Sequence, residues 1–217
     1  ISISTSKSTG NNTVVESYGT NKVTTGSGDD FVEADKYSSN TINVGDGDNI
    51  VVLDSAGNNK VTAGKGDDRV SVNNYSSNTI SVGDGNNEVI LDGFGTNKVT
   101  AGNDNNTISA NTGINTIKLG KGNNEVSLAG GINTVKTGAG NNIMTIGDGI
   151  NKVTTGKGDD VFTVNDGNNT FNSGASKTAV TYDADEDVFV GGDQYYINGG
   201  YNTIKTTGAP YVNITDS

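Results

Sequence analysis

The chain of 217 residues has 32 glycines, only 31% hydrophobic residues and a formal net charge of -11. It has no cysteine and no histidine, which excludes disulfide bonds, thiolate chemistry and the nucleophilic triads that use a histidine base. The negative charge argues against nucleic acid as a partner, and no apolar run approaches the length of a membrane span. We therefore expect a non-enzymatic protein with no nucleic-acid partner and no membrane insertion.

The first residues already alternate between polar and apolar side chains. The chain opens at Ile1 without a signal peptide, so we expect a mature form or an excised piece. The stretch "ISISTSKSTG" predicts a first strand. With a single proline and evenly spaced β-branched residues, the chain does not have the composition of a disordered segment.

From there on, two polar positions recur at a fixed interval. The first is an Asn followed by Thr or Lys and then an apolar residue, in steps of 19 and later 18, at Asn21, Asn40, Asn59, Asn78, Asn97, Asn115, Asn133, Asn151 and Asn169. The second lies midway, at Asp30, Asn49, Asp68, Asn87, Asn106, Asn124, Asn142 and Asp160. Each repeat thus holds two short alternating strands, separated by Gly, Asn, Asp and Ser, which favour turns.

A repeat this short cannot bury its own apolar face, but stacked copies can. We predict an all-β fold, a parallel β-solenoid resembling a β-roll, with two short strands and two turns in each rung of 18 or 19 residues. The chain length corresponds to roughly 10 or 11 rungs. Residues 1–175 would form the repeat solenoid, and residues 176–217 irregular C-terminal rungs or a cap of the same domain. Alternation directs the following residues inward: Val23, Ile42, Val61, Ile80, Val99, Ile117, Val135 and Val153 on one wall, and Val32, Val51, Val70, Val89, Ile108, Val126, Met144 and Phe162 on the other.

The turns at the second polar position share a glycine phrase, as in "GSGDD", "GDGDN", "GKGDD", "GDGNN", "GKGNN" and "GAGNN". These phrases resemble the nonapeptide G-G-x-G-x-D-x-U-x of the RTX, or haemolysin-type calcium-binding, family. The resemblance covers roughly residues 20–175 and implies calcium held by loop carbonyls and aspartates of neighbouring rungs. The sequence departs from the family pattern, because Thr25, Val44, Ala63 or Val82 replaces the first glycine and Asn often replaces the aspartate.

Two interpretations of this edge stay open. One is Ca²⁺ bound by the candidate ligands Asp29, Asp30, Asp48, Asp67, Asp68, Asp159 and Asp160. The other is a ladder of stacked side chains that needs no ion, as we expect for the Asn21 to Asn169 column. A further acidic stretch, "YDADEDVFVGGDQ", resembles the start of an EF-hand loop, but Val188 and Gln194 occupy positions that require Gly and Glu. We interpret it as a solvated edge where the repeat changes register.

One wall carries only Thr, Lys, Ser and Asn on its outer face. The candidate ligand-face residues are Lys22, Thr24, Thr41, Lys60, Thr62, Thr79, Lys98, Thr100, Thr116, Lys118, Thr134, Lys136, Lys152 and Thr154. A structural interpretation is that Thr favours exposed strand positions and Lys prevents aggregation of sheets. Alternatively, this flat face binds an extended partner such as a polysaccharide, a cell surface or ice.

These features favour a secreted or cell-surface module with a structural or adhesive role. The resemblance to RTX proteins implies a bacterial origin and secretion by a type I system. Two alternatives stay open: a subunit of an extracellular fibre that stacks head to tail through its termini, and a solenoid that binds ice or polysaccharide through the Thr and Lys face. The lysines between the threonines argue against ice binding, because a hydrated ammonium group disturbs an ordered water lattice.

Overall fold

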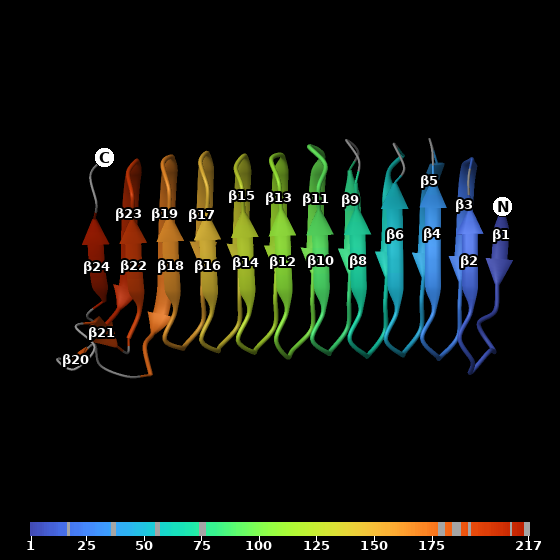
Figure 1. Ribbon diagram of the computed structural model, residues 1–217, viewed down its shortest axis with the longest axis horizontal. Coiled ribbons are helices and arrows are strands. Elements are labelled where there is room, and N and C mark those ends of the chain that lie inside the picture. The colour runs from blue at the N-terminus through green and yellow to red at the C-terminus, as the bar shows by residue number, and fades with distance from the viewer. Residues whose placement is uncertain are drawn as a thin grey trace.

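The structure, a computed structural model, describes residues 1–16, 18–35, 38–54, 57–73, 77–177, 181–183, 188–190, 192–208 and 210–214. Two parallel sheets of 11 strands each run along the molecule, and the chain passes from one to the other at every turn. Figure 1 shows the strands side by side along the long axis, from β1 at the N-terminal end to β24. The prediction of a parallel β-solenoid is confirmed, and the described residues include no helix.

The first sheet, called sheet A here, contains the strand that follows each Asn of the first column. Its order is β1-β3-β5-β7-β9-β11-β13-β15-β17-β19-β23. The bounds are β1 Ser2–Ser4, β3 Gly19–Thr24, β5 Ser38–Asn43, β7 Asn59–Thr62, β9 Asn78–Ser81, β11 Thr96–Thr100, β13 Ile114–Lys118, β15 Ile132–Lys136, β17 Ile150–Thr154, β19 Asn168–Ala175 and β23 Tyr201–Thr207.

The second sheet, sheet B, contains the strand that follows each glycine phrase. Its order is β2-β4-β6-β8-β10-β12-β14-β16-β18-β22-β24. The bounds are β2 Thr13–Glu16, β4 Phe31–Asp35, β6 Ile50–Asp54, β8 Arg69–Val72, β10 Glu88–Leu91, β12 Thr107–Ala110, β14 Glu125–Leu128, β16 Ile143–Ile146, β18 Val161–Val164, β22 Gln194–Ile197 and β24 Tyr211–Ile214.

Register between rungs follows the repeat, so that like residues stack on like. Asn97 pairs with Asn78 on one side and Asn115 on the other, and Val99 pairs in the same way with Ile80 and Ile117. Alternate strand residues point to opposite faces, so that β12 and β14, for example, bury their apolar residues and expose their polar ones. All of the inward residues expected from the sequence are buried.

The apolar core changes character toward the C-terminal end. Valine, isoleucine and leucine fill most of the space between the sheets, whereas Phe162, Phe171 and Tyr195 fill the last rungs. The Phe162 and Tyr195 rings stack with their centroids 4.5 Å apart, and Phe171 meets both rings edge-on. These larger side chains bury more apolar area per rung than a valine pair does.

One insertion interrupts the regular succession of turns. Between β19 in sheet A and β22 in sheet B, the chain forms a separate antiparallel pair, β20 (Thr181–Asp183) with β21 (Val188–Val190), beside the C-terminal rungs in Figure 1. The solenoid then resumes, because β22 pairs in parallel with β18. Of the acidic stretch noted in the sequence, residues 184–187 and 191 lie outside the described residues. Among those described, no helix is long and apolar enough to cross a membrane.

Candidate functional site

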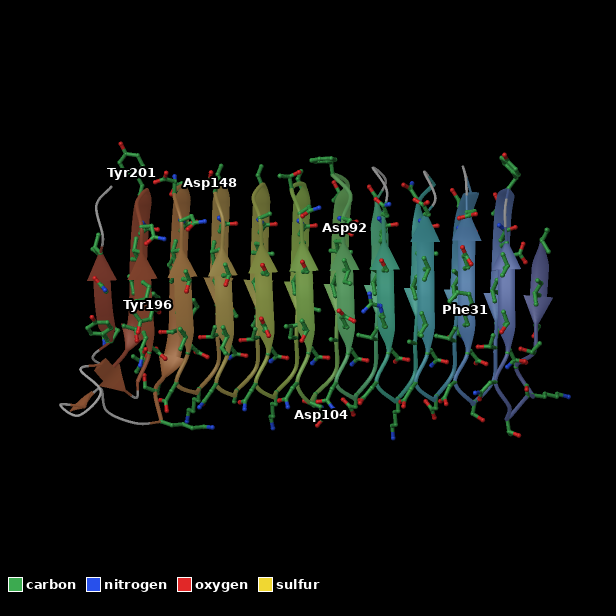
Figure 2. All side chains as sticks on the ribbon, viewed as in Figure 1. Phe31, Asp92, Asp104, Asp148, Tyr196 and Tyr201 are labelled. Carbon is green, nitrogen blue, oxygen red and sulfur yellow. The ribbon has the colours of Figure 1, made fainter. Side chains whose placement is uncertain are left out.

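The glycine turns, defined as the turns between a sheet A strand and the next sheet B strand, stack backbone on backbone. A Cβ atom placed on Gly45 would lie 1.8 Å from the carbonyl oxygen of Gly26 in the preceding rung. Gly47 adopts a φ of +120°, a conformation that L side chains rarely adopt. Asp104 occupies the equivalent position of its turn and has a φ of 78°, the one positive φ at a non-glycine residue among those described. Figure 2 shows Asp104 at the edge formed by these turns, with Asp92 and Asp148 at the opposite edge.

At that opposite edge, the first column of asparagines forms a continuous ladder inside the molecule. The side-chain Nδ2 of each Asn donates to Oδ1 of the next, from Asn21 to Asn202, at distances of 2.7 to 3.0 Å. All members as far as Asn169 are buried. Each amide supplies one donor and one acceptor to the ladder, so the column needs no ion. The prediction of a structural ladder at this edge is confirmed.

The second column lies at the base of the glycine turns and is also buried. Its Oδ1 atoms accept hydrogen bonds from the preceding rung, as when Asn49 Nδ2 donates to Asp68 Oδ1 at 2.9 Å. In the asparagine rungs, Nδ2 also donates to carbonyls of its own turn: from Asn49 to Gly47 and Gly45 at 2.8 and 3.1 Å. Asn87 repeats these bonds to its own turn.

Two aspartates of this column, Asp30 and Asp68, keep the Oδ1 bond but lack the amide donor. Their Oδ2 atoms are buried and have no hydrogen-bond partner. Oδ2 replaces the asparagine Nδ2, which in Asn49 and Asn87 donates to turn carbonyls, so an acceptor stands where those rungs have a donor. Burial, the largest influence, raises the pKa of Asp68 to about 6, although the hydrogen bonds from Asn49 act in the opposite direction. A buried carboxylate oxygen and a carbonyl oxygen are both hydrogen-bond acceptors. To stabilise such a pair, either the carboxylate must carry a proton or a cation must lie between the two oxygens.

Asp160, farther along the same column, is satisfied by a hydroxyl group. Its Oδ2 accepts a hydrogen bond from Thr155 Oγ1 at 2.6 Å, and its Oδ1 accepts from Asn142 Nδ2 at 2.7 Å. Burial raises the pKa of Asp160 despite these bonds, and the charge of Asp193 raises it further. Thr25 stands at the same separation before Asp30, but its hydroxyl is buried without a partner.

Asp193, which was not predicted from the sequence, continues the column after the insertion. The Asp160 N–H donates to its Oδ1 at 3.1 Å, across 33 residues. Its Oδ2 accepts bonds from Ser173 Oγ at 2.5 Å and Thr206 Oγ1 at 3.2 Å. The interpretation of residues 182–194 as a solvated edge is therefore wrong for Asp193, which is fully buried. Only the glycine pair before it, in "GGDQ", signalled a return of the repeat.

The other aspartates expected as ligands form a separate outer column. Asp29, Asp48 and Asp67 are exposed, and Asp159 is half-buried. Their Oδ1 atoms accept backbone N–H bonds from the next rung, such as Asp48 N to Asp29 Oδ1 at 2.9 Å. The structure thus divides the seven predicted ligands between an inner and an outer column instead of bringing them together.

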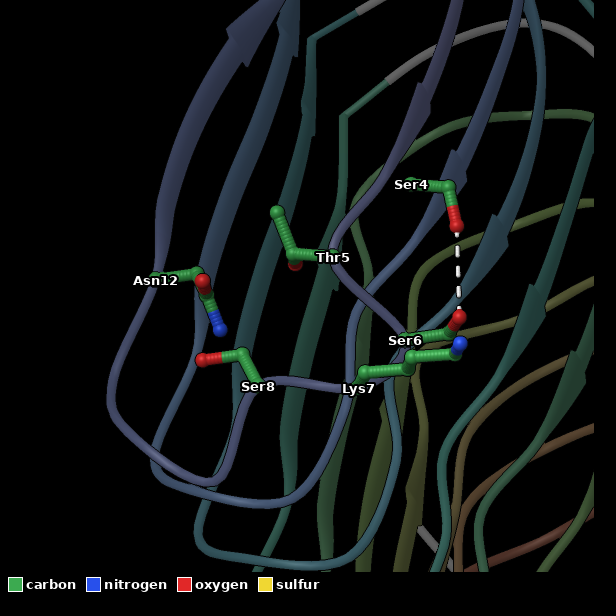
Figure 3. A pocket seen from close by; sticks show the side chains of 6 residues that line it. All are labelled: Ser4, Thr5, Ser6, Lys7, Ser8 and Asn12. Carbon is green, nitrogen blue, oxygen red and sulfur yellow. Dashed lines mark hydrogen bonds between the residues drawn. The ribbon is translucent and has the colours of Figure 1, made fainter.

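No group of three acidic side chains converges to hold a metal ion among the residues that the structure describes. A polar hollow of about 470 Å³ lies at the N-terminal end, lined by Ser4, Thr5, Ser6, Lys7, Ser8 and Asn12 (Figure 3). It offers no carboxylate. Any cation at the glycine turns would thus have to take most of its ligands from backbone carbonyls.

The predicted ligand-face residues do form one surface, the outer face of sheet A. Lys22, Thr41, Lys60 and Thr79 stack directly in successive strands, and this rank continues to Lys152. The members that begin with Thr24 form a second rank two residues further along each strand.

Stacked rungs of 18 or 19 residues with glycine turns along one edge define a repeat protein of the parallel β-roll class. Residues 51–74, 100–135 and 145–176 match the RTX calcium-binding nonapeptide repeat, in four copies. The chain therefore carries repeats of the RTX calcium-binding nonapeptide family, and the resemblance seen in the sequence is confirmed. Comparisons with curated proteins and with solved structures gave no match.

The calcium that this family implies fits some rungs and not others. At Asp30 and Asp68, a buried carboxylate oxygen without a hydrogen-bond partner replaces the amide nitrogen that donates to turn carbonyls in the asparagine rungs, and carboxylate and carbonyl oxygens are the ligands that Ca²⁺ requires. At Asn106, Asn124 and Asn142 the amide nitrogen occupies that position and already donates to the turn, so no anionic ligand is present. Asp160 is an intermediate case: it supplies a carboxylate, but Thr155 already donates a hydrogen bond to its second oxygen.

Proposed function

We propose that the protein is a non-catalytic structural or adhesive module of an extracellular protein, stabilised by Ca²⁺ at Asp30 and Asp68. RTX repeats are typical of secreted bacterial proteins and the family is usually non-catalytic. The absence of histidine and cysteine from the sequence supports the same conclusion. Calcium would neutralise the two buried carboxylates, and the rest of the solenoid would be held by its amide ladders.

The observation that carries the proposal is the pair of orphan oxygens, Oδ2 of Asp30 and of Asp68. A buried polar atom without a partner costs about 1 to 3 kcal/mol, and more when it is charged. An ion that binds the folded state only would offset this cost, and the melting temperature would rise with ion concentration. Because most rungs need no ion, we expect the protein to stay largely β-structured in chelator.

The test is a thermal melt, followed by circular dichroism, with chelator and with millimolar calcium, on the wild type and on Asp30→Asn/Asp68→Asn. We expect calcium to raise the melting temperature of the wild type and to leave that of the double variant unchanged. The matched control is Asp29→Asn/Asp67→Asn, which removes the same charge from the neighbouring outer column and should retain the calcium effect. An equal loss of the effect in both double variants, or no calcium effect on the wild type, would contradict the proposal.

Fibre formation and ice binding stay predictions. At the C-terminal end, β23 and β24 each have a strand partner on one side only among the described residues, and a hollow of about 200 Å³ at this end is lined in part by apolar Ile197, Ile204 and Ile214. A strand of another copy could add to such an edge. Electron microscopy of concentrated protein tests for filaments one solenoid wide. Thermal hysteresis of the purified protein tests for ice binding.

A further inference from the structure

The charges of this acidic chain are separated between its two sheets. The strands of sheet A contain no Asp or Glu, and they expose seven lysines: Lys22, Lys60, Lys98, Lys118, Lys136, Lys152 and Lys205. Among the described residues, none of these lysines has an ion-pair partner. A chain with a net charge of -11 therefore has one broad face that is purely basic.

Sheet B has the opposite character. Its strands carry Glu33, Asp35, Asp54, Glu88 and Glu125 on the accessible side, with Arg69 as their one basic residue, paired to Glu88. Prevention of aggregation does not account for this separation, because mixed charges on both sheets would serve that purpose equally well. Like charges gathered on one flat face raise the local potential and attract a partner of opposite charge.

The lysines of sheet A are also ordered along the solenoid axis. Lys22, Lys60 and Lys98 occupy the same register position in every second strand, and strands in a sheet lie about 4.8 Å apart, so successive ammonium groups repeat roughly every 10 Å. Thr41 and Thr79 stand between them and present hydroxyl groups. From β3 to β11 this register position is therefore a row of alternating cations and hydrogen-bonding groups that runs across the strands, and beyond it the position holds Thr116, Thr134 and Lys152.

We propose that the outer face of sheet A binds an acidic polysaccharide, laid lengthwise along the solenoid. In a polymer with one carboxylate for every two sugar residues, the charges repeat at about twice the separation of neighbouring strands. The carboxylates would pair with Lys22, Lys60 and Lys98, and the sugar hydroxyls would bond to the intervening threonines. This inference names a partner for the adhesive role proposed above and rests on that role, but not on calcium binding.

The same face suits nucleic acid less well. A DNA duplex carries one charge per about 1.7 Å of axis, a much denser line than one lysine per roughly 10 Å. The sheet A strands expose no arginine, and the one aromatic residue on their outer face, Tyr201, lies beyond the ordered row of lysines. Stacking platforms for bases are thus absent from the part of sheet A between β3 and β17.

The experiment measures binding of hyaluronan oligosaccharides to the whole protein by calorimetry at low ionic strength, once with calcium and once with chelator. The test variant is Lys22→Gln/Lys60→Gln/Lys98→Gln. The matched control is Lys65→Gln/Lys121→Gln/Lys157→Gln, which removes three exposed charges from the glycine turns. Dextran serves as the neutral polymer and single-stranded DNA as the alternative polyanion. Circular dichroism and melting temperature confirm that both variants fold.

We expect the test variant to lose at least about tenfold in affinity for hyaluronan and the control to change less than about twofold, since only sheet A presents the ordered charges. Affinity should rise with chain length until the oligosaccharide spans Lys22 to Lys98, roughly 19 Å over four strand steps. Equal losses in both variants, no binding to the wild type, or tighter binding of DNA through the same lysines would overturn the inference. Calcium-dependent melting that persists in those cases would leave the calcium proposal intact.

Discussion

The buried carboxylates near the two ends of the glycine-turn column differ in how their second oxygen is satisfied. At the C-terminal end, Thr155 donates to Asp160, and Ser173 and Thr206 donate to Asp193. Nearer the N-terminus, the second oxygens of Asp30 and Asp68 have no partner. The repeat is the same in both regions, so the backbone alone does not decide whether a rung needs an ion. What differs is whether a hydroxyl donates to the second oxygen: Thr155 and Ser173 do so, whereas Thr25, at the same separation before Asp30, makes no such bond.

The largest effect should come from removing the carboxylate at the centre of the hydroxyl-bonded region. Asp193→Ala leaves the Asp160 N–H and the hydroxyls of Ser173 and Thr206 without their acceptor. With each buried group costing 1 kcal/mol or more, we expect a loss of about 4 kcal/mol in the free energy of unfolding. Urea denaturation would measure it. Calcium should not restore the loss, and recovery in calcium would show that this end also binds the ion.

The pH dependence in chelator should reveal the unsatisfied carboxylate of Asp68. Its pKa is about 6 in the folded protein against 3.8 for an ordinary Asp, so the folded state holds the proton more tightly than the unfolded state. The contribution of Asp68 to stability is therefore full below about pH 4 and is lost as pH rises through about 6, to the extent of about 3 kcal/mol. In the Asp68→Asn variant, residue 68 cannot titrate. The difference between its urea denaturation curves and those of the wild type gives the contribution of Asp68 to the free energy of unfolding. Parallel pH profiles for the two proteins would contradict it.

Thr155→Val should leave the second oxygen of Asp160 without a hydrogen-bond donor, as in Asp30 and Asp68. Valine keeps the shape of threonine but cannot donate to Asp160. We expect a loss of about 2 kcal/mol in chelator, because the second oxygen of Asp160 becomes an unpartnered buried acceptor. We also expect a new stabilisation by calcium. Thr25→Val is the control, since the Thr25 hydroxyl has no partner to lose. A loss of similar size in the control would show that the hydroxyl is not the deciding group.

The reverse exchange should have the smallest effect. Ala63 precedes Asp68 by the same five residues that separate Thr155 from Asp160, and it is buried. Ala63→Thr places a hydroxyl beside the orphan oxygen, so we expect a gain of about 1 kcal/mol in chelator and a smaller response to calcium. Calcium titrations followed by melting temperature would measure both. Ala63→Val controls for the added volume, and an equal gain with valine would assign the effect to packing.

The sequence predicted the solenoid because one period controls everything that is repeated. Strand register, both polar columns and the inward residues all follow from an interval of 18 or 19, and stacking like on like leaves little freedom. Adjacent Asp29 and Asp30 lie on opposite sides of the turn, exposed and buried respectively, although the resemblance to RTX repeats implies both as ligands. The interval did not predict Asp193, because the insertion before it interrupts the regular spacing. The bond from Thr155 to Asp160 could not be predicted for another reason: in the glycine phrase, threonine at that position is a replacement for the first glycine, and the phrase assigns it no hydrogen bond.

The insertion of β20 and β21 shows that a glycine turn tolerates added chain. The column advances by 18 residues from Asn142 to Asp160 and by 33 to Asp193, yet the hydrogen bonds between rungs resume unchanged in kind. Both ends of the added segment return to positions fixed by the stacked neighbours, so its length is not constrained by the core. This rung of the glycine edge thus accommodates added chain while the hydrogen bond to the next member of the column is kept. For the same reason, it is the natural point at which to graft a foreign loop without disturbing the rod.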